Sequence, residues 1–310
     1  MCKNKNIKRV LVPVQFDKAS KKLLRYACQL ASTLGAELLL LHNTKTKDLT
    51  LTQQSSFIHQ LRTFGECIFS EGLKSGAVPV PYECVVKPGC LSNCVAGVVF
   101  DYKVDLVLME TCVLHQEEEE NDPDNAAAIM EVVSCPVMVM PCTTTFKKIE
   151  NLVFATDFTD QDDHVLNQIG SFADQAGARL TLVQTYSKSE RQQLSNYKAA
   201  MRAVEERLTS KNVRLRLLEE EDTLEGISDF AEQSAADMLI LATQDNYLLQ
   251  RLFSSNYIKT AAYHTRYPIL TFRQQKKKPC SGLCANCVNK KAVQQQDILN
   301  TLAFADTVRR

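Results

Sequence analysis

The stretch Val10-Leu11-Val12-Pro13-Val14-Gln15-Phe16 decides the fold, because it recurs as Leu152-Val153-Phe154-Ala155-Thr156-Asp157-Phe158. Each copy is an apolar run of strand length that ends in polar residues. A Gly-Ala pair recurs at the same spacing, as Gly35-Ala36 and Gly177-Ala178. A repeat of this period in a chain of 310 residues predicts two consecutive copies of one domain.

Strand-like and helix-like patterns alternate within each copy. Short apolar runs such as Val10–Val14, Leu38–Leu41 and Val137–Met140 are typical of buried parallel strands. The segment Lys18–Leu34 places its apolar residues on one helical face, and Gly35 can end that helix. The alternation predicts an α/β fold, with a doubly wound parallel sheet of five strands in each repeat.

The repeat pattern also sets the expected domain boundaries. We expect one domain over residues 1–145 and a second over residues 146–274. Residues 275–310 differ in composition and form a cysteine-rich tail, in which Ala292–Val308 has the pattern of a short amphipathic helix.

The repeated first strand, the Gly-Ala turn and the closing Cys135-Pro136-Val137-Met138-Val139 resemble tandem universal stress proteins of the UspA-like kind. The resemblance covers about residues 7 to 273. It implies a Rossmann-like fold, related to the adenine nucleotide alpha hydrolases, with strand order 3-2-1-4-5 in each repeat. It also implies that domains pair through their fifth strands, a pairing that two repeats can make internally.

The glycine loop of ATP-binding family members is degenerate in this chain. Those members carry Gly-x2-Gly-x9-Gly-Ser/Thr directly after strand four, where glycines let backbone N–H groups approach phosphate oxygens. Aligned on this pattern, the first repeat holds Glu110, Val113, Pro123 and Asp124, and the second holds Ala242, Asp245, Ser255 and Asn256.

The loss of every motif glycine predicts that ATP is not a cofactor. A carboxylate about 4 Å from a phosphate would be repelled by about 4 kcal/mol at an effective dielectric constant of about 20. The acidic residue that the family places after strand one is Gln15 in repeat 1 and Asp157 in repeat 2. Repeat 2 therefore keeps one adenosine-side contact, and its degenerate cleft remains a candidate site for an adenine nucleotide or a smaller ligand. The residues of that cleft are Asp157, Ala242, Asp245, Ser255 and Asn256.

Three cysteines in the tail have the spacing of a metal site. Cys280, Cys284 and Cys287 follow the pattern Cys-x3-Cys-x2-Cys. Three thiolates can hold a zinc ion or an iron–sulfur cluster, and zinc would need a fourth ligand from Cys2, Cys142 or a second chain. A mobile tail of reduced thiols and a disulfide switch remain alternatives.

Composition and motifs narrow the function classes. Basic and acidic residues are equal at 36 each, which gives no reason to expect nucleic acid or an anionic membrane as partner. The absence of a signal-like segment and of a long apolar run predicts a cytoplasmic protein. We find no acid–base or nucleophile constellation, so we expect no enzyme.

The leading hypothesis is a non-catalytic stress-response or regulatory protein that acts through protein partners or through self-association of fifth strands. One alternative is an adenine-nucleotide-binding regulator that uses repeat 2. The other is a metal or redox sensor that uses the cysteine tail.

Overall fold

The computed structural model describes residues 6–44, 46–74, 79–111, 126–141, 144–155, 162–208, 210, 212–221, 223–243 and 267–273. The chain divides into two compact units, residues 1–274 and 275–310, and all the described residues belong to the first.

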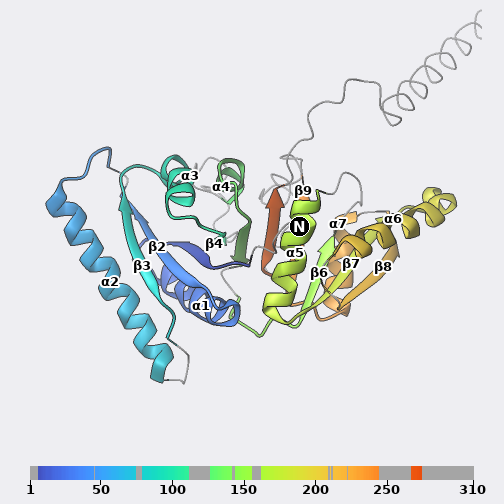
Figure 1. The fold of residues 1–310 in the computed structure, drawn as a ribbon, viewed down its shortest axis with the longest axis horizontal. Helices are drawn as coiled ribbons and strands as arrows, with labels where there is room; N and C mark the ends of the chain where they lie inside the picture. Colours follow the sequence, from blue (N-terminus) through green and yellow to red (C-terminus); the bar gives the residue numbers. More distant parts are fainter. Residues whose placement is uncertain are drawn as a thin grey trace, which may run out of the picture. The chain divides into compact units, whose positions relative to one another are not determined.

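The strands of the described residues form one sheet (Figure 1). Those of the first repeat are β1 (Arg9–Pro13), β2 (Glu37–Asn43), β3 (Tyr82–Lys87), β4 (Leu106–Thr111) and β5 (Val137–Pro141). Those of the second repeat are β6 (Asn151–Ala155), β7 (Arg179–Tyr186), β8 (Val213–Glu219), β9 (Met238–Thr243) and β10 (Ile269–Arg273). The sheet has ten strands in the order β3-β2-β1-β4-β5-β10-β9-β6-β7-β8.

The strand order confirms the expected topology of each repeat. Read from the outer edge inward, each half has the order 3-2-1-4-5, and neighbouring strands within a half are parallel. The halves meet where β5 and β10 run antiparallel, with Ile269 opposite Val139 and Thr271 opposite Val137. The two predicted five-stranded sheets are thus joined into one mixed sheet by the internal pairing of the fifth strands.

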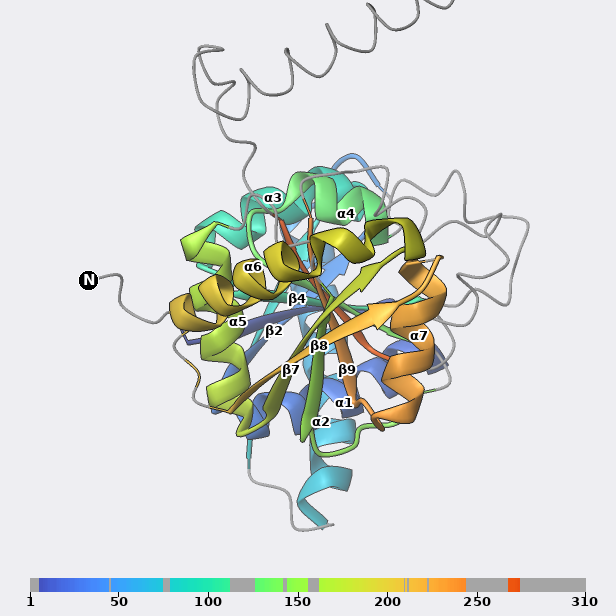
Figure 2. The ribbon, with the colours of Figure 1, turned by 90° about the vertical axis from the view of Figure 1, so that its right-hand side faces the viewer.

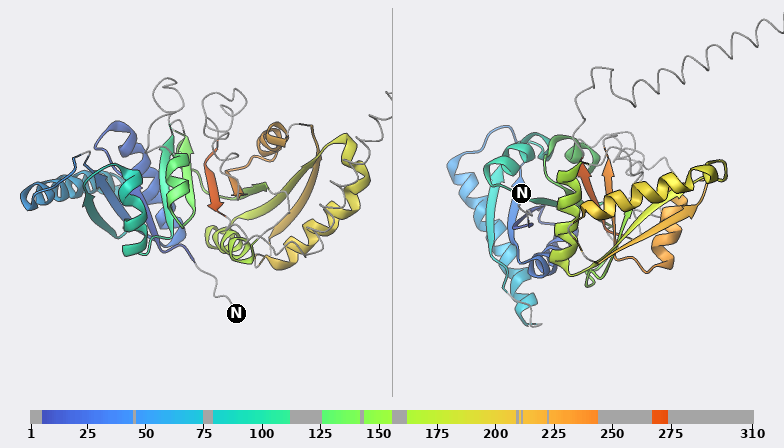
Figure 3. Two further views of the ribbon diagram at one scale, coloured as in Figure 1. Left: turned by 90° about the horizontal axis from the view of Figure 1, so that it is seen from above. Right: turned by 45° about the vertical axis from the view of Figure 1, so that its right-hand side comes forward.

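Helices cover both faces of this sheet (Figures 2 and 3). A large core cluster packs one face against four helices, and two smaller clusters pack the other face against three. The four on the first face are α1 (Lys18–Leu34), α2 (Leu51–Lys74), α5 (Asp163–Ala176) and α6 (Leu194–Arg207). Those on the second face are α3 (Leu91–Asp101), α4 (Ala126–Val132) and α7 (Thr223–Gln233), and a short 3-10 helix, η1 (Lys188–Gln193), precedes α6.

Local sequence sets the ends of the first helix of each repeat. Asp17 caps α1 by accepting a hydrogen bond from the Ser20 backbone N–H at 2.7 Å, and Asp162 caps α5 in a similar way. Both helices end at a glycine in the left-handed region, Gly35 with φ 61° and Gly177 with φ 66°. The helix stops predicted at these glycines are therefore confirmed.

A glutamine joins the two repeats away from the sheet. Gln175 on α5 accepts a hydrogen bond from the Ile7 backbone N–H at 2.9 Å and donates one to the Ile7 carbonyl at 2.7 Å. Its amide also donates to the carbonyl of Leu34, the last residue of α1. The start of repeat 1 is thus tied to the first helix of repeat 2.

No helix within the described ranges is both long enough and apolar enough to span a membrane.

Candidate functional site

The candidate site of each repeat lies at the carboxyl ends of its strands. In repeat 1, α1 leaves β1 toward one face of the sheet, whereas α4 follows β4 on the opposite face. Between these two neighbouring strands the winding reverses, and in open α/β sheets ligands bind at this point. The residues that follow β1 and end β4 therefore decide what the site can hold.

Polar side chains after β1 and β2 bond to one another. The Gln15 side-chain amide donates to Asn43 Oδ1 at 2.7 Å, and the Gln15 backbone N–H donates to Ser20 Oγ at 2.9 Å. Asn43, which is buried, donates in turn to the carbonyl of Gly89 at 3.4 Å. The Gln15 side chain is therefore already engaged by a neighbouring strand.

An aromatic cluster holds the connection from β1 to α1. The His42 ring lies 4.4 Å from the ring of Phe16 and 5.2 Å from that of Phe57, measured between centroids. Its Nδ1 donates to the Val14 carbonyl at 2.8 Å, and burial lowers the pKa of the imidazole. Phe16 has φ 62°, a left-handed conformation that costs a residue with a side chain about 1–2 kcal/mol. The Phe16–His42 contact and a second one with Phe64, at 5.7 Å, stabilise this conformation.

Glu110, predicted from the sequence to align with the first glycine of the motif, lies at the end of β4. Its side chain is half-buried, and this burial raises the pKa of the carboxyl group. The positive charge of Lys22 lowers that pKa, and the negative charge of Asp17 raises it. An acidic side chain therefore stands at the carboxyl end of β4, at the edge where the site lies.

Repeat 2 is described only in part at this edge. Ala242 lies on β9, is half-buried against the large core cluster and is paired in register with Phe272 of β10. The remaining predicted cleft and loop positions lie outside the described residues: Asp157, Asp245, Ser255 and Asn256 in repeat 2, and Val113, Pro123 and Asp124 in repeat 1.

A buried side-chain oxygen on β7 of repeat 2 has no hydrogen-bond partner in the described part of the chain. Gln184 on β7 takes the place that His42 has on β2, and it is buried with an exposed fraction of 7%. Its Oε1 atom accepts no hydrogen bond from any described residue. A buried acceptor of this kind is costly unless a donor reaches it.

The predicted metal ligands Cys280, Cys284 and Cys287 lie outside the described residues. Within the described ranges, no group of three His, Cys, Asp or Glu side chains could hold a metal ion. Burial raises the pKa of Cys28 to about 12 and that of Cys84 to about 11, which makes these two thiols poor nucleophiles at neutral pH.

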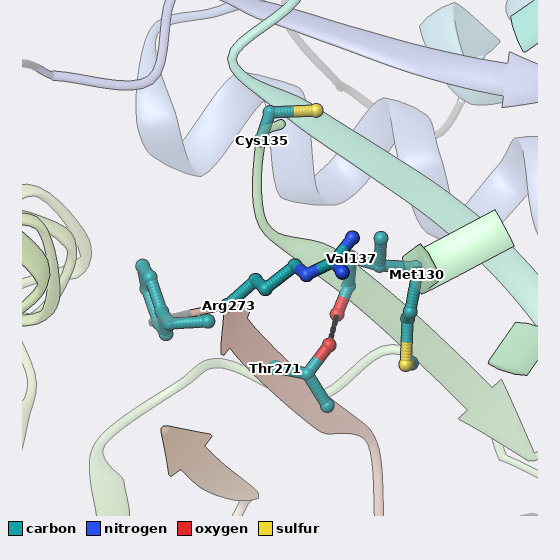
Figure 4. Close-up of a pocket in the computed structure, with 6 residues that line it drawn as sticks. Met130, Cys135, Val137, Thr271 and Arg273 are labelled. Carbon is teal, nitrogen blue, oxygen red and sulfur yellow. Dashed lines mark hydrogen bonds between the residues drawn. The ribbon is translucent and has the colours of Figure 1, made fainter. Parts of the chain in front are cut away.

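A small depression lies at the seam between the repeats (Figure 4). Thr271 on β10 donates its hydroxyl proton to the Val137 carbonyl of β5 at 3.0 Å. The Arg273 guanidinium reaches across the seam and donates to the backbone carbonyl of Glu131. These bonds fasten the fifth strands, and the site is a structural junction. Its lining residues are Met130, Cys135, Val137, Thr271, Phe272 and Arg273.

Several residues of the repeat 1 site were not predicted from the sequence. Asn43, His42 and Lys22 all contribute, and none has a motif of its own. A signal existed for two of them, because His42 and Asn43 directly follow the apolar run Leu38–Leu41. Parallel strands end at one edge of a sheet, so polar residues after this run belong beside Gln15.

Comparisons with known proteins agree with this architecture. The universal stress protein family model matches residues 6–141 and residues 148–273. A comparison with curated proteins gave no match.

Solved structures share the fold over most of the chain. A universal stress protein from Archaeoglobus fulgidus DSM 4304 aligns with a TM-score of 0.59 and 12% identity, over 89% of this chain and 100% of that one. A structure from Pseudomonas aeruginosa UCBPP-PA14, provisionally assigned to the same family, aligns with a TM-score of 0.52 and 16% identity. The alignment covers 86% of this chain and 93% of that one. The cytoplasmic domain of a prokaryotic cation chloride cotransporter aligns with a TM-score of 0.50 and 11% identity, over 86% of this chain and 95% of that one.

Proposed function

Because the chain belongs to the universal stress protein family, we propose that it is a stress-response protein that catalyses no reaction and acts through protein contacts. Membership of the family supports the stress-response role. The absence of catalysis and of ATP binding is supported by the groups that occupy the site of repeat 1.

The position of Glu110 carries this proposal. Its half-buried carboxyl group lies at the end of β4, where the family resemblance would place a phosphate cradle, and the negative charge of Asp17 acts on it. A triphosphate brought to this edge would meet negative charge. The repulsion between two negative charges about 4 Å apart is about 4 kcal/mol at an effective dielectric constant of about 20. Phosphate binding in repeat 1 is therefore disfavoured.

The neighbouring strand end supports the same conclusion. Gln15 replaces the acidic residue of the family and its side-chain amide is bonded to Asn43. A ligand that used this position would have to break that bond and leave the buried Asn43 oxygen without its donor.

Calorimetry with magnesium–ATP on the full chain tests the proposal. We expect no saturable heat at millimolar ATP and no phosphate release. Saturable binding or phosphate release that Asp157→Ala abolishes, and that the exposed control Asp174→Ala leaves intact, would refute it.

An adenine-nucleotide regulator that uses repeat 2 is the second candidate. Gln184 supports it, because a buried oxygen that no described residue satisfies could accept a hydrogen bond from a ligand amino or hydroxyl group. Since the glycine loop is lost, such a ligand would be recognised through its nucleoside part. We expect adenosine and AMP to bind with about equal affinity in that case, and Gln184→Met to weaken both. If titrations detect neither ligand at millimolar concentration, this candidate is removed.

The metal or redox role of the cysteine tail remains a proposal based on spacing alone. Metal analysis of protein purified without chelators decides it: stoichiometric zinc or iron that Cys280→Ser removes would support the role, and a content near zero would end it. A reducing, cytoplasmic setting belongs to the main proposal and is supported by the described cysteines, none of which forms a disulfide bond.

A further inference from the structure

The sheet has an open edge at β8. Among the described strands β8 is the last in the order, so one row of its backbone N–H and C=O groups has no neighbouring strand. Figure 2, viewed from the side on which β8 lies in Figure 1, shows β8 in front of the sheet, between α6 and α7. Such an edge can accept an added strand from another polypeptide. The fifth strands cannot serve this purpose, because β5 and β10 are interior strands that pair with each other.

The side chains of β8 alternate in character. Val213, Leu215 and Leu217 point toward the large core cluster but are only half-buried. Arg214 and Arg216 alternate with them on the opposite face and are exposed. No hydrogen bond or ion pair of the described residues involves either arginine side chain. Glu219 lies on the apolar side of the strand, where it pairs with Arg191. It therefore does not compensate the charges of Arg214 and Arg216.

The equivalent place in repeat 1 carries the opposite charge. There Arg9 is held by Glu37 at 2.6 Å and by Glu83 at 3.7 Å. The sheet registers place Arg179 where Glu37 stands and Arg214 where Glu83 stands. The position of Arg9 is taken by the neutral Asn151.

The basic charge of the β8 edge therefore comes from side chains that its own neighbours do not neutralise. Arg179 contacts Asn151 Oδ1 at 3.5 Å, while its buried Nε has no partner among the described residues. A repeat that only had to fold could have kept the neutralised arrangement of repeat 1.

We propose that the β8 edge binds an extended acidic segment of a partner protein as an added strand. The proposal rests on the proposed function and names its contact surface. Backbone groups of the segment pair with the free edge of β8, and its carboxylates at alternate positions lie opposite Arg214 and Arg216. Directly opposed residues in paired strands have Cβ atoms about 4.5–5.5 Å apart, so each carboxylate can reach its arginine.

The apolar residues of β8 fix the rest of the pattern. Residues between the acidic ones face the half-buried Val213, Leu215 and Leu217, and apolar side chains there would complete their burial. The partner segment is thus an alternation of acidic and apolar residues. A nucleic acid fits less well, because it cannot pair with a strand edge and because the chain has no net positive charge.

A fluorescein-labelled peptide TEVEVET, titrated with the full-length protein and followed by anisotropy, tests the proposal. We expect binding that weakens with salt, and a loss of at least about tenfold in affinity, or about 1.4 kcal/mol, in R214E/R216E. Arg202→Glu changes an exposed charge on α6, which covers the sheet face opposite to Arg214 and Arg216, and should alter the affinity less than about twofold. The charge-reversed peptide TKVKVKT should bind R214E/R216E more tightly than it binds the wild-type protein.

A peptide with N-methyl groups on alternate residues tests the backbone pairing, because it cannot donate to the edge and should not bind. The proposal is overturned if TEVEVET shows no binding at millimolar protein, if R214E/R216E keeps the wild-type affinity, or if the N-methylated peptide binds equally well. A single-stranded oligonucleotide that displaces the peptide at lower concentration would overturn it in favour of nucleic acid. If circular dichroism shows R214E/R216E to be unfolded, R214Q/R216Q is titrated instead, with the same outcomes. The ATP calorimetry is independent, so absent peptide binding with no ATP heat removes the edge proposal alone.

Discussion

The Gln175 clamp between the repeats gives a prediction whose size can be worked out. Gln175→Met keeps the length of the side chain and its helix propensity but removes all three of its hydrogen bonds, two to Ile7 and one to Leu34. A hydrogen bond contributes about 0.5–1.5 kcal/mol net, and Ile7 is buried, so its groups are poorly hydrated once the amide is gone. We expect the free energy of unfolding to fall by about 2–3 kcal/mol.

Urea unfolding of the full chain, followed by circular dichroism, measures this loss. With an m-value of about 2–3 kcal/mol/M, the midpoint should fall by about 1 M. Gln60→Met is the matched control, because Gln60 is an exposed residue in the interior of α2. A urea midpoint for Gln175→Met within about 0.2 M of the control would refute the clamp. The loss of three hydrogen bonds to part-buried groups should lower the free energy of unfolding by more than such a shift allows.

Four further changes have defined outcomes. Thr271→Val removes the hydroxyl bond to the Val137 carbonyl and should cost about 1 kcal/mol in urea unfolding, whereas a cost near zero would mean that the seam does not depend on it. Gly35→Ala meets no atom within 4 Å but must adopt φ 61°, so thermal unfolding should report a loss of about 1–2 kcal/mol; an unchanged melting temperature would contradict the cap. Burial lowers the pKa of His42, so the unfolded state takes up the proton first as the pH falls. The stability of the wild type should therefore fall as the pH drops below about 6.5, and that of His42→Gln should fall less. Parallel stability–pH profiles of the two proteins would contradict this. Burial raises the pKa of Glu110, so ionisation of its carboxyl group opposes folding as the pH rises above about 4.5. Glu110→Gln should therefore be more stable than the wild type at pH 7 but not at pH 4. A variant that is less stable than the wild type at pH 7 would contradict this.

The sequence by itself determined the repeated architecture, because the signals involved are local. An apolar run such as Leu38–Leu41 predicts a buried strand wherever it lies, and Gly35 and Gly177 end helices because few other residues adopt a positive φ at low cost. The motif spacing also placed Gln15 and Glu110 at the edge where the site lies. The interpretation that Glu110 replaces a motif glycine rests on the sequence alone and stays a prediction.

Only the tertiary structure decided which polar groups meet. The clamp joins Gln175 to Ile7, which lies 168 positions earlier, and no spacing rule connects two such residues. The bond between Gln15 and Asn43 depends on β1 and β2 ending side by side, and the charge reversal at β8 emerges only when the strand registers place Arg214 where repeat 1 has Glu83. Periodicity records which face a side chain takes, but it carries no information on the distance to residues of other elements. Packing alone sets that distance, and it determines whether a charge is neutralised or left for a partner.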